Sequence, residues 1–308
     1  MQRPTATPDE RPPLAPGAPA LPAAAHRRGP EGHFSSPRNF LDNRFVYAVV
    51  SQRARGLSLG VNLNPDKLCN FNCLYCEVNR DEPGVDARVN VRLMSHELLA
   101  LLSRAFEGRM RELPAFRNTP EELLELKEVA LSGNGEPTLC PNFSEIVREV
   151  VYLRSQGRFP FFKLVLITNA TALDSREVAE GLKLFSTHDE IWAKLDAGNQ
   201  DYMDRINRPL VGLEKILDNI LQLARRRPVV IQSLFPLVEG VEPPTAEIEA
   251  YVERLAKLKA DGAQINLVQV YSAHRPPHSP ACNHLPLRSL SRIAHRIKEV
   301  TGLRAEVF

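Results

Sequence analysis

Three cysteines, Cys69, Cys73 and Cys76, lie within eight residues of this 308-residue chain. Thiolates so close in sequence can converge on one soft metal centre, as iron–sulfur clusters and zinc require. A structural zinc site needs four closed ligands, and an electron-transfer cluster normally has four cysteines. Three cysteines therefore favour a cluster that leaves one iron open to a substrate. The alternative is a zinc site completed by Cys140, Cys282 or a histidine.

A glycine-rich segment from Ser132 onwards is the second candidate site. Gly133, Asn134, Gly135 and Glu136 follow an apolar run that predicts a strand. Glycines let the backbone turn tightly and approach a ligand closely, and a carboxylate just past them can accept hydrogen bonds from an ammonium group. The segment therefore fits a bound amino acid, whereas the simpler interpretation is an ordinary turn after a strand.

Polar residues at the ends of two later apolar runs are further candidates. Thr168 and Asn169 follow one run, and Lys194 and Asp196 end the next. Alternation along a strand puts Lys194 and Asp196 on the same face as Trp192, so this face carries charge. If it points into the fold, Lys194 can pair with a carboxylate and Asp196 with a hydroxyl. The alternative is that Asn169 and Asp196 cap the helices that follow them.

Three more polar features have weaker signals. Gln232 lies in an apolar strand and is expected to face either a cavity or the polar interior of the fold. Arg275 precedes two prolines after the last predicted strand and is a candidate for substrate binding, the alternative being a rigid exit loop. The run Arg225 to Arg227 is more typical of a solvated helix end than of a nucleic-acid surface.

The elements that must position these residues follow from hydropathy. Short apolar runs predict six strands, at 56–63, 127–132, 162–168, 190–196, 228–235 and 264–271. Amphipathic segments between them predict helices, and capping-box spacing is present at Asn142 with Glu145 and at Asp174 with Glu177. This order predicts an α/β fold, with a parallel sheet and outer helices. Six units are too few for an eight-stranded barrel but can form a partial (β/α)6 barrel, with ligands at the carboxyl ends of its strands.

The ends of the chain and its composition complete the prediction. Residues 287–300 predict a closing helix, and 304–308 a short last strand. Residues 1–36, rich in proline and alanine, predict a disordered leader before one domain at 37–308. The formal net charge of +2 excludes a strong general attraction to polyanions, and no apolar run approaches the ~18 residues that span a bilayer. With few cysteines and no signal-peptide pattern, we expect a cytoplasmic protein without membrane association.

The C-x3-C-x2-C loop after the first predicted strand resembles the hallmark of the radical S-adenosylmethionine (SAM) superfamily. The resemblance covers about residues 55–271 and implies that the three loop cysteines bind a [4Fe–4S] cluster whose fourth iron SAM chelates. It implies that Tyr75 lies near the adenine and that residues 133–136, with Asn134 interrupting the glycine pair, hold the methionine amine. Thr168, Asn169, Asp196 and Gln232 are further expected cofactor contacts. One-electron reduction of SAM would then give a 5′-deoxyadenosyl radical that abstracts hydrogen from a substrate.

Within that superfamily, the chain most resembles the iron–sulfur oxidoreductases related to the tRNA wyosine-synthesis enzyme. The resemblance rests on five short segments, at 58–61, 132–138, 195–198, 206–209 and 271–277. The wyosine enzyme builds a tricyclic base from methylated guanosine and pyruvate and holds a second cluster on upstream cysteines. No cysteine precedes Cys69 here, so neither that cluster nor the wyosine activity itself is expected.

The resemblance also implies partners. We expect a reductant protein such as flavodoxin or ferredoxin, and a substrate that is a tRNA base or a small molecule, with Lys194 and Arg275 as the candidate catalytic residues. Two other functions fit the same cysteines. One is a non-catalytic zinc- or cluster-binding module, and the other is an activase that generates a radical on a partner protein.

Overall fold

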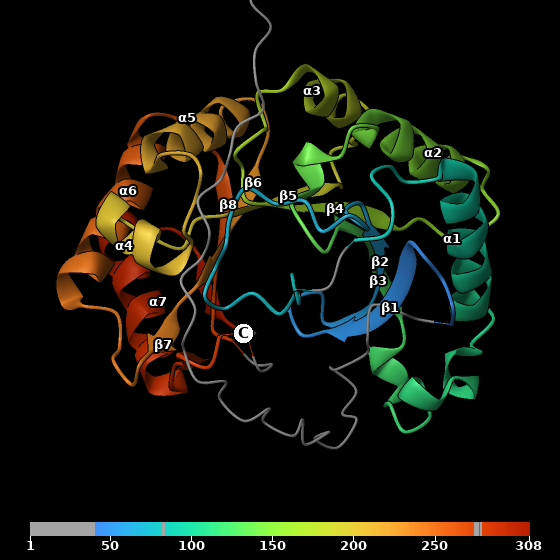
Figure 1. Ribbon diagram of the computed structural model, residues 1–308, viewed down its shortest axis with the longest axis horizontal. Coiled ribbons are helices and arrows are strands. Elements are labelled where there is room, and N and C mark those ends of the chain that lie inside the picture. Colours follow the sequence, from blue (N-terminus) through green and yellow to red (C-terminus); the bar gives the residue numbers. More distant parts are fainter. Residues whose placement is uncertain (1–40, 82–83, 274–276, 278) are drawn as a thin grey trace, which may run out of the picture. The chain divides into compact units, whose positions relative to one another are not determined.

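A sheet of eight strands forms the centre of the fold (Figure 1). The computed structural model describes residues 41–308 except 82–83, 274–276 and 278, so the predicted leader lies outside the described residues. The strand order is β1-β2-β3-β4-β5-β6-β8-β10, and all neighbours are parallel except β1 and β2. The strands are β1 Val46–Ser51, β2 Gly56–Asn62, β3 Leu126–Ser132, β4 Lys163–Thr168, β5 Glu190–Lys194, β6 Val229–Leu234, β8 Ile265–Tyr271 and β10 Ala305–Val307.

All six predicted parallel strands are confirmed, as β2 to β6 and β8, with ends within two residues of the prediction. The short last strand is confirmed as β10. The antiparallel edge strand β1 was not predicted, nor was a separate antiparallel pair formed by β7 (Pro236–Val238) and β9 (Cys282–His284). The partial-barrel α/β fold is confirmed.

Helices follow most of the parallel strands and lie on the outer side of the sheet, from α1 beside β1 and β2 to α7 beside β8 and β10 (Figure 1). The closing helix is confirmed as α7. The helices are α1 Val91–Phe106, α2 Phe143–Ser155, α3 Arg176–Leu182, α4 Gln200–Ile206, α5 Leu213–Ala224, α6 Thr245–Ala260 and α7 Leu287–Thr301, with short 3-10 turns at Met110–Glu112, Pro114–Phe116, Glu121–Leu123 and Pro137–Leu139. No helix in the described ranges is both long and apolar enough to cross a bilayer.

The capping boxes differ from the prediction. Helix α3 starts one residue later than expected, because the hydroxyl of Ser175 accepts the hydrogen bond from Val178 N, so a box at Asp174 is wrong. Asn142 does precede α2, but its side-chain amide donates to Glu145 Oε2 at 3.2 Å instead of accepting from the helix.

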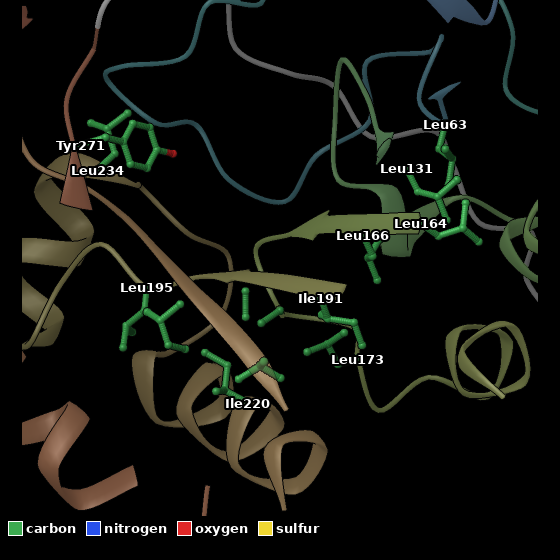
Figure 2. Packing of buried hydrophobic residues seen from close by; sticks show 14 of the residues in the cluster. Leu63, Leu131, Leu164, Leu166, Leu173, Ile191, Leu195, Ile220, Leu234 and Tyr271 are labelled. Carbon is green, nitrogen blue, oxygen red and sulfur yellow. The ribbon is translucent and has the colours of Figure 1, made fainter. Parts of the chain in front are cut away.

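The outer face of the sheet carries the main hydrophobic core. Buried leucine, isoleucine and valine side chains alternate along each strand and pack against the helices. Figure 2 shows part of this layer, with Leu131, Leu166 and Ile191 from three successive strands. Because these positions face outwards, the residues between them face the interior of the partial barrel.

The inner face is mostly polar. A small second cluster of Val165, Trp192 and Val230 occupies its middle and is separate from the main core. Polar residues lie on either side of this cluster along the strands. They are Ser58, Glu128, Lys163 and Glu190 towards the amino ends, and Lys194, Gln232, Gln269 and Tyr271 towards the carboxyl ends.

The two edge strands, β1 and β10, are not neighbours in the sheet. The turn between β1 and β2 nevertheless reaches β10, because Arg55 forms an ion pair with Glu306, with 2.9 Å between Nη2 and Oε2. This turn therefore bridges the open side of the partial barrel.

Candidate cofactor-binding site

The three clustered cysteines lie on the loop that follows β2, at the carboxyl end of the parallel strands. All three are partly exposed, and all five cysteines of the chain are free thiols. Burial raises the pKa of Cys73 to about 12. Burial also raises the pKa of Cys69, and the nearby Cys76 adds to this rise. A metal that binds here must therefore displace thiol protons.

The glycine-rich segment after β3 packs directly against the cysteine loop. Glu136 N donates to Leu68 O at 2.9 Å, and Asn134 N donates to Asn62 Oδ1 at 2.9 Å. A Cβ atom on Gly135 would lie 1.8 Å from Leu68 O. Glycine is needed at this position because two backbones meet, so one of the predicted close approaches is made to the cysteine loop itself.

The carboxylate of Glu136 joins the ends of β3 and β4. It accepts hydrogen bonds from Thr138 N at 3.0 Å, Thr138 Oγ1 at 2.6 Å, Thr168 Oγ1 at 2.5 Å and Asn169 N at 2.7 Å. Burial raises the pKa of Glu136, and these hydrogen bonds act in the opposite direction. Four bonds leave little capacity for the ammonium group that the sequence suggested, so the side chain positions two loops.

The loop after β4 holds the cysteine loop from a second side. Asn169 Nδ2 donates to Asn70 Oδ1 at 2.8 Å, and Asn70 Nδ2 donates to Thr171 Oγ1 at 2.8 Å. Asn169 Oδ1 accepts from Thr171 N at 3.1 Å, two residues on. The side chain of Asn169 therefore forms a local turn and a loop contact, and the alternative that it caps α3 is wrong.

A third contact comes from β5 and the end of α4. The carboxylate of Asp196 accepts from the Tyr75 hydroxyl, from Asn207 Nδ2 at 3.0 Å and from Leu234 N at 2.8 Å. Asn199 caps α4, so the helix-cap alternative for Asp196 is also wrong. The hydrogen bonds that the Asp196 carboxylate accepts come from protein groups, whereas the sequence predicts a hydrogen bond from a ligand hydroxyl.

Asn207 is a functional candidate that the sequence analysis did not single out. Its Nδ2 lies 3.4 Å from Cys73 Sγ and 2.8 Å from the Tyr75 hydroxyl, and its carbonyl accepts from Asn72 N at 3.0 Å. In the sequence, segment 206–209 carries only a family resemblance and no signal for this role. One buried asparagine thus contacts a candidate ligand, the aromatic residue beside it and the loop backbone.

Lys194 and Gln232 face the interior beside this network. Lys194 Nζ lies 3.4 Å from Asp196 Oδ1, 3.0 Å from the Tyr271 hydroxyl and 5.1 Å from the ring centre of Tyr75. Burial alone lowers the pKa of Lys194, but Asp196 and Tyr271 outweigh it and hold the pKa above its ordinary value. Gln232 accepts from the Tyr271 hydroxyl at 3.3 Å. Lys194 is therefore a fixed cation at the rim of the interior.

Other predicted residues lie elsewhere. Arg275 lies outside the described residues. Arg225 and Arg227 donate to backbone carbonyls, which supports a structural role for this basic run. Cys140 and Cys282 lie outside the cysteine loop and are buried, and burial raises the pKa of each to about 11.

The donor set fits an iron–sulfur cluster better than a zinc ion. Within the described part of the chain, no three His, Cys, Asp or Glu side chains are placed to hold one metal ion. In a cluster each thiolate binds its own iron, so the three sulfur atoms need not meet at one point, whereas zinc gathers four ligands around one centre. Three thiols spread along one anchored loop therefore suit a cluster, in which each thiolate binds its own iron.

A curled parallel sheet with a three-thiol loop at its carboxyl edge defines an iron–sulfur enzyme of the partial-barrel class. The family comparison agrees, since the radical SAM superfamily profile matches residues 63–244. The chain belongs to the radical SAM superfamily, whose enzymes use a [4Fe–4S] cluster and SAM and require a reductant. The matched range contains every candidate site residue except Arg275.

Relatives and solved structures extend this result. A UPF0026 protein of Synechocystis is 32% identical over 225 residues, which cover 72% of this chain and 74% of that protein. The mouse S-adenosyl-L-methionine-dependent tRNA 4-demethylwyosine synthase TYW1 is 26% identical over 216 residues, covering 67% of this chain and 26% of that protein.

Two solved structures share the fold. A radical SAM methyltransferase from Sphaerobacter thermophilus matches with a TM-score of 0.58 at 13% identity, covering 85% of this chain and 68% of that one. A TYW1 structure with a bound lysine–pyruvate adduct matches with a TM-score of 0.50 at 18% identity, covering 80% of this chain and 74% of that one.

Proposed function

We propose that Cys69, Cys73 and Cys76 hold a [4Fe–4S] cluster and that the enzyme cleaves SAM reductively to oxidise or modify a substrate by hydrogen abstraction. The observation that carries this proposal is the anchoring of the cysteine loop by the ends of β3, β4 and α4, through Glu136, Asn169 and Asn207. When bound, the cluster and SAM supply a 5′-deoxyadenosyl radical. The chain's own residues then have to bind, orient and shield that reaction.

The rim around the loop offers suitable binding groups. Lys194 is a partly exposed cation and suits the carboxylate of SAM or of an anionic substrate. Tyr75 is 8% exposed, and its ring is proposed to lie near the adenine. The backbone of residues 133–135 remains the proposed site for the methionine amine. Thr168, Asn169, Asp196 and Gln232 are proposed to orient these groups.

Lys194 acts in this proposal as a cation and not as a nucleophile. The TYW1 structure carries a lysine–pyruvate adduct. Schiff-base formation needs a neutral amine, which enzymes obtain by lowering a lysine pKa, whereas Asp196 and Tyr271 raise the pKa of Lys194. We therefore expect borohydride treatment with pyruvate to leave the mass of Lys194-containing peptides unchanged. A reduced pyruvate adduct on Lys194 would contradict this role.

The substrate and reductant are part of the same proposal. The similarity to the mouse tRNA 4-demethylwyosine synthase supports a tRNA base as one substrate class. A small-molecule substrate is the second candidate, supported by the polar inner face of the partial barrel. A flavodoxin or ferredoxin is the proposed electron donor, in a cytoplasmic setting that the five free thiols support.

The test is anaerobic reconstitution with iron and sulfide, followed by dithionite and SAM. We expect the wild-type chain to release 5′-deoxyadenosine and methionine. Cys73→Ala should lose cluster iron and this product, while Cys140→Ala, a matched change at a buried thiol outside the loop, should keep both. A Cys73→Ala protein that still cleaves SAM at the wild-type rate would refute the ligand assignment, and stoichiometric zinc in a colourless wild-type protein would favour the binding-module alternative.

A second assay separates the substrate classes. Deuterated RNA, small-molecule and polypeptide fractions are offered in turn, and the mass of the released 5′-deoxyadenosine shows which fraction gives up a deuterium atom to the radical. Deuterium taken from a polypeptide would support the activase alternative, and deuterium taken from RNA or from a small molecule would support the enzyme proposed here.

A further inference from the structure

Arg53 forms no ion pair with an acidic side chain in the described part of the chain, although its charge influences the buried carboxyl of Glu128. It lies in the turn between β1 and β2, and its guanidinium carbon lies 4.6 Å from the ring centre of Tyr271, the last residue of β8. Its Nε atom is buried without a hydrogen-bond partner, and its side chain forms no ion pair with any residue in the described ranges. A buried donor without an acceptor is unfavourable unless a ligand completes it.

The neighbouring charges on the inner face are already paired. Lys163 Nζ lies 2.8 Å from Glu190 Oε1, and Lys194 Nζ lies 3.4 Å from Asp196 Oδ1. Glu128 is the remaining acidic group near Arg53, and it is 1% exposed. Burial raises the pKa of Glu128 to about 7, so near neutral pH this carboxyl is only partly charged. The interior therefore carries excess positive charge at Arg53.

Two cationic side chains, Arg53 and Lys194, lie near the side chain of Tyr271. Arg53 stacks on its ring, while Lys194 Nζ lies 5.4 Å from the ring centre and 3.0 Å from the hydroxyl. A guanidinium that stacks on an aromatic ring keeps its N–H edge available for a planar, bidentate acceptor. Carboxylate and phosphate groups have that geometry.

We propose that Arg53, supported by Tyr271 and flanked by Lys194, binds an oxyanion group of the substrate inside the partial barrel. This inference rests on the proposed function, because it assigns the substrate class of the same barrel. The substrate is then a molecule that carries a carboxylate or a phosphate. The bridging turn that holds Arg53 serves as one wall of the substrate site.

The experiment measures anion binding directly, with the full chain after treatment with iron and sulfide and without SAM. Inorganic phosphate and acetate are the two probes. Ligand-observed NMR at constant ionic strength measures the dissociation constant of each. We expect saturable binding of at least one probe to wild type and at least tenfold weaker binding to Arg53→Gln, with Arg53→Lys intermediate because it keeps the charge but loses the fork. Arg92→Gln, the same change at an exposed arginine of α1, is the control and should bind as wild type does.

The outcomes separate the alternatives. Binding of phosphate alone assigns a phosphorylated substrate, and binding of acetate alone assigns a carboxylic acid. Wild type that binds neither probe, or Arg53→Gln that binds as tightly as wild type, overturns the inference. Iron content is measured on the same samples. A chain that binds a probe through Arg53 but never retains iron would contradict the proposed function and leave this inference standing.

Discussion

The side-chain amide of Asn207 donates to the sulfur of Cys73, with 3.4 Å between Nδ2 and Sγ, across 134 positions of sequence. The same nitrogen also contacts the Tyr75 hydroxyl and Asp196. A cysteine ligand is thereby tied to the carboxyl edge of β5 through one buried group. Hydrogen bonds to cluster sulfurs are among the factors that set reduction potentials.

Removing this donor should lower the reduction potential of the bound cluster. In Asn207→Ala the Cys73 sulfur loses a hydrogen bond that stabilises the more negatively charged, reduced state. An EPR-monitored redox titration measures the potential directly. Arg208→Ala, at the adjacent exposed position, is the control and should match wild type. An unchanged potential in Asn207→Ala would show that this contact does not tune the cluster.

A methyl group at Gly135 should displace the cysteine loop. The new Cβ would lie 1.8 Å from the backbone oxygen of Leu68, and backbone cannot yield as a flexible side chain can. We expect Gly135→Ala to lose about 1–3 kcal/mol of stability and most of its iron after reconstitution. Thermal melting and iron analysis measure the two effects. Gly212→Ala, where the nearest atom is 3.6 Å away, should lose neither.

Two tyrosine-to-phenylalanine changes should have opposite effects. Tyr75→Phe removes a hydroxyl that donates to buried Asp196, so we expect a loss of about 1–3 kcal/mol. Tyr202→Phe removes a buried hydroxyl that has no hydrogen-bond partner, so stability should stay constant or rise. Chemical denaturation compares the two variants with wild type. Equal losses at both positions would contradict the contacts described here.

Glu128 should make stability depend on pH near neutrality. Its pKa is raised from 4.5 to about 7 by burial, so folding favours the protonated form. The associated stability is fully present below pH 4.5 and is lost as pH rises through 7, by roughly 3 kcal/mol in all. Glu128→Gln cannot ionise, so its melting temperature relative to wild type should increase from pH 5 to pH 8. A constant difference over this range would mean that Glu128 does not titrate as described.

Most of the fold could be predicted because its parallel strands are buried on the outer face and read as short apolar runs. Strand β1 was missed, although its buried residues Val46, Ala48 and Val50 alternate with Tyr47 and Val49. Five of the six residues of β1 are apolar or aromatic, so the alternation is hidden in a continuous apolar run. Helix α4 was missed because its seven residues are too few to show a helical period.

The candidate site was only partly predictable. Cys69, Cys73 and Cys76 stand together in sequence, so their spacing alone indicates metal chemistry. The roles of Glu136 and Asp196 depend on donors from other strands, which no local pattern reveals. Nothing in the local sequence distinguishes Arg53 from other turn arginines, because its contact with Tyr271 depends on the curvature of the sheet.

The chain contains a single tryptophan, Trp192, and this residue lies in the middle of the inner face, 2% exposed, with its indole nitrogen donating to Glu190 at 2.7 Å. Tryptophan fluorescence of this protein therefore comes from one position on the inner face of the partial barrel and from none of the outer helices. Emission from unlabelled protein will register how crowded and how polar the interior of the barrel is. Ligand binding in the barrel, or entry of water into it, can therefore be followed in real time by the fluorescence of Trp192.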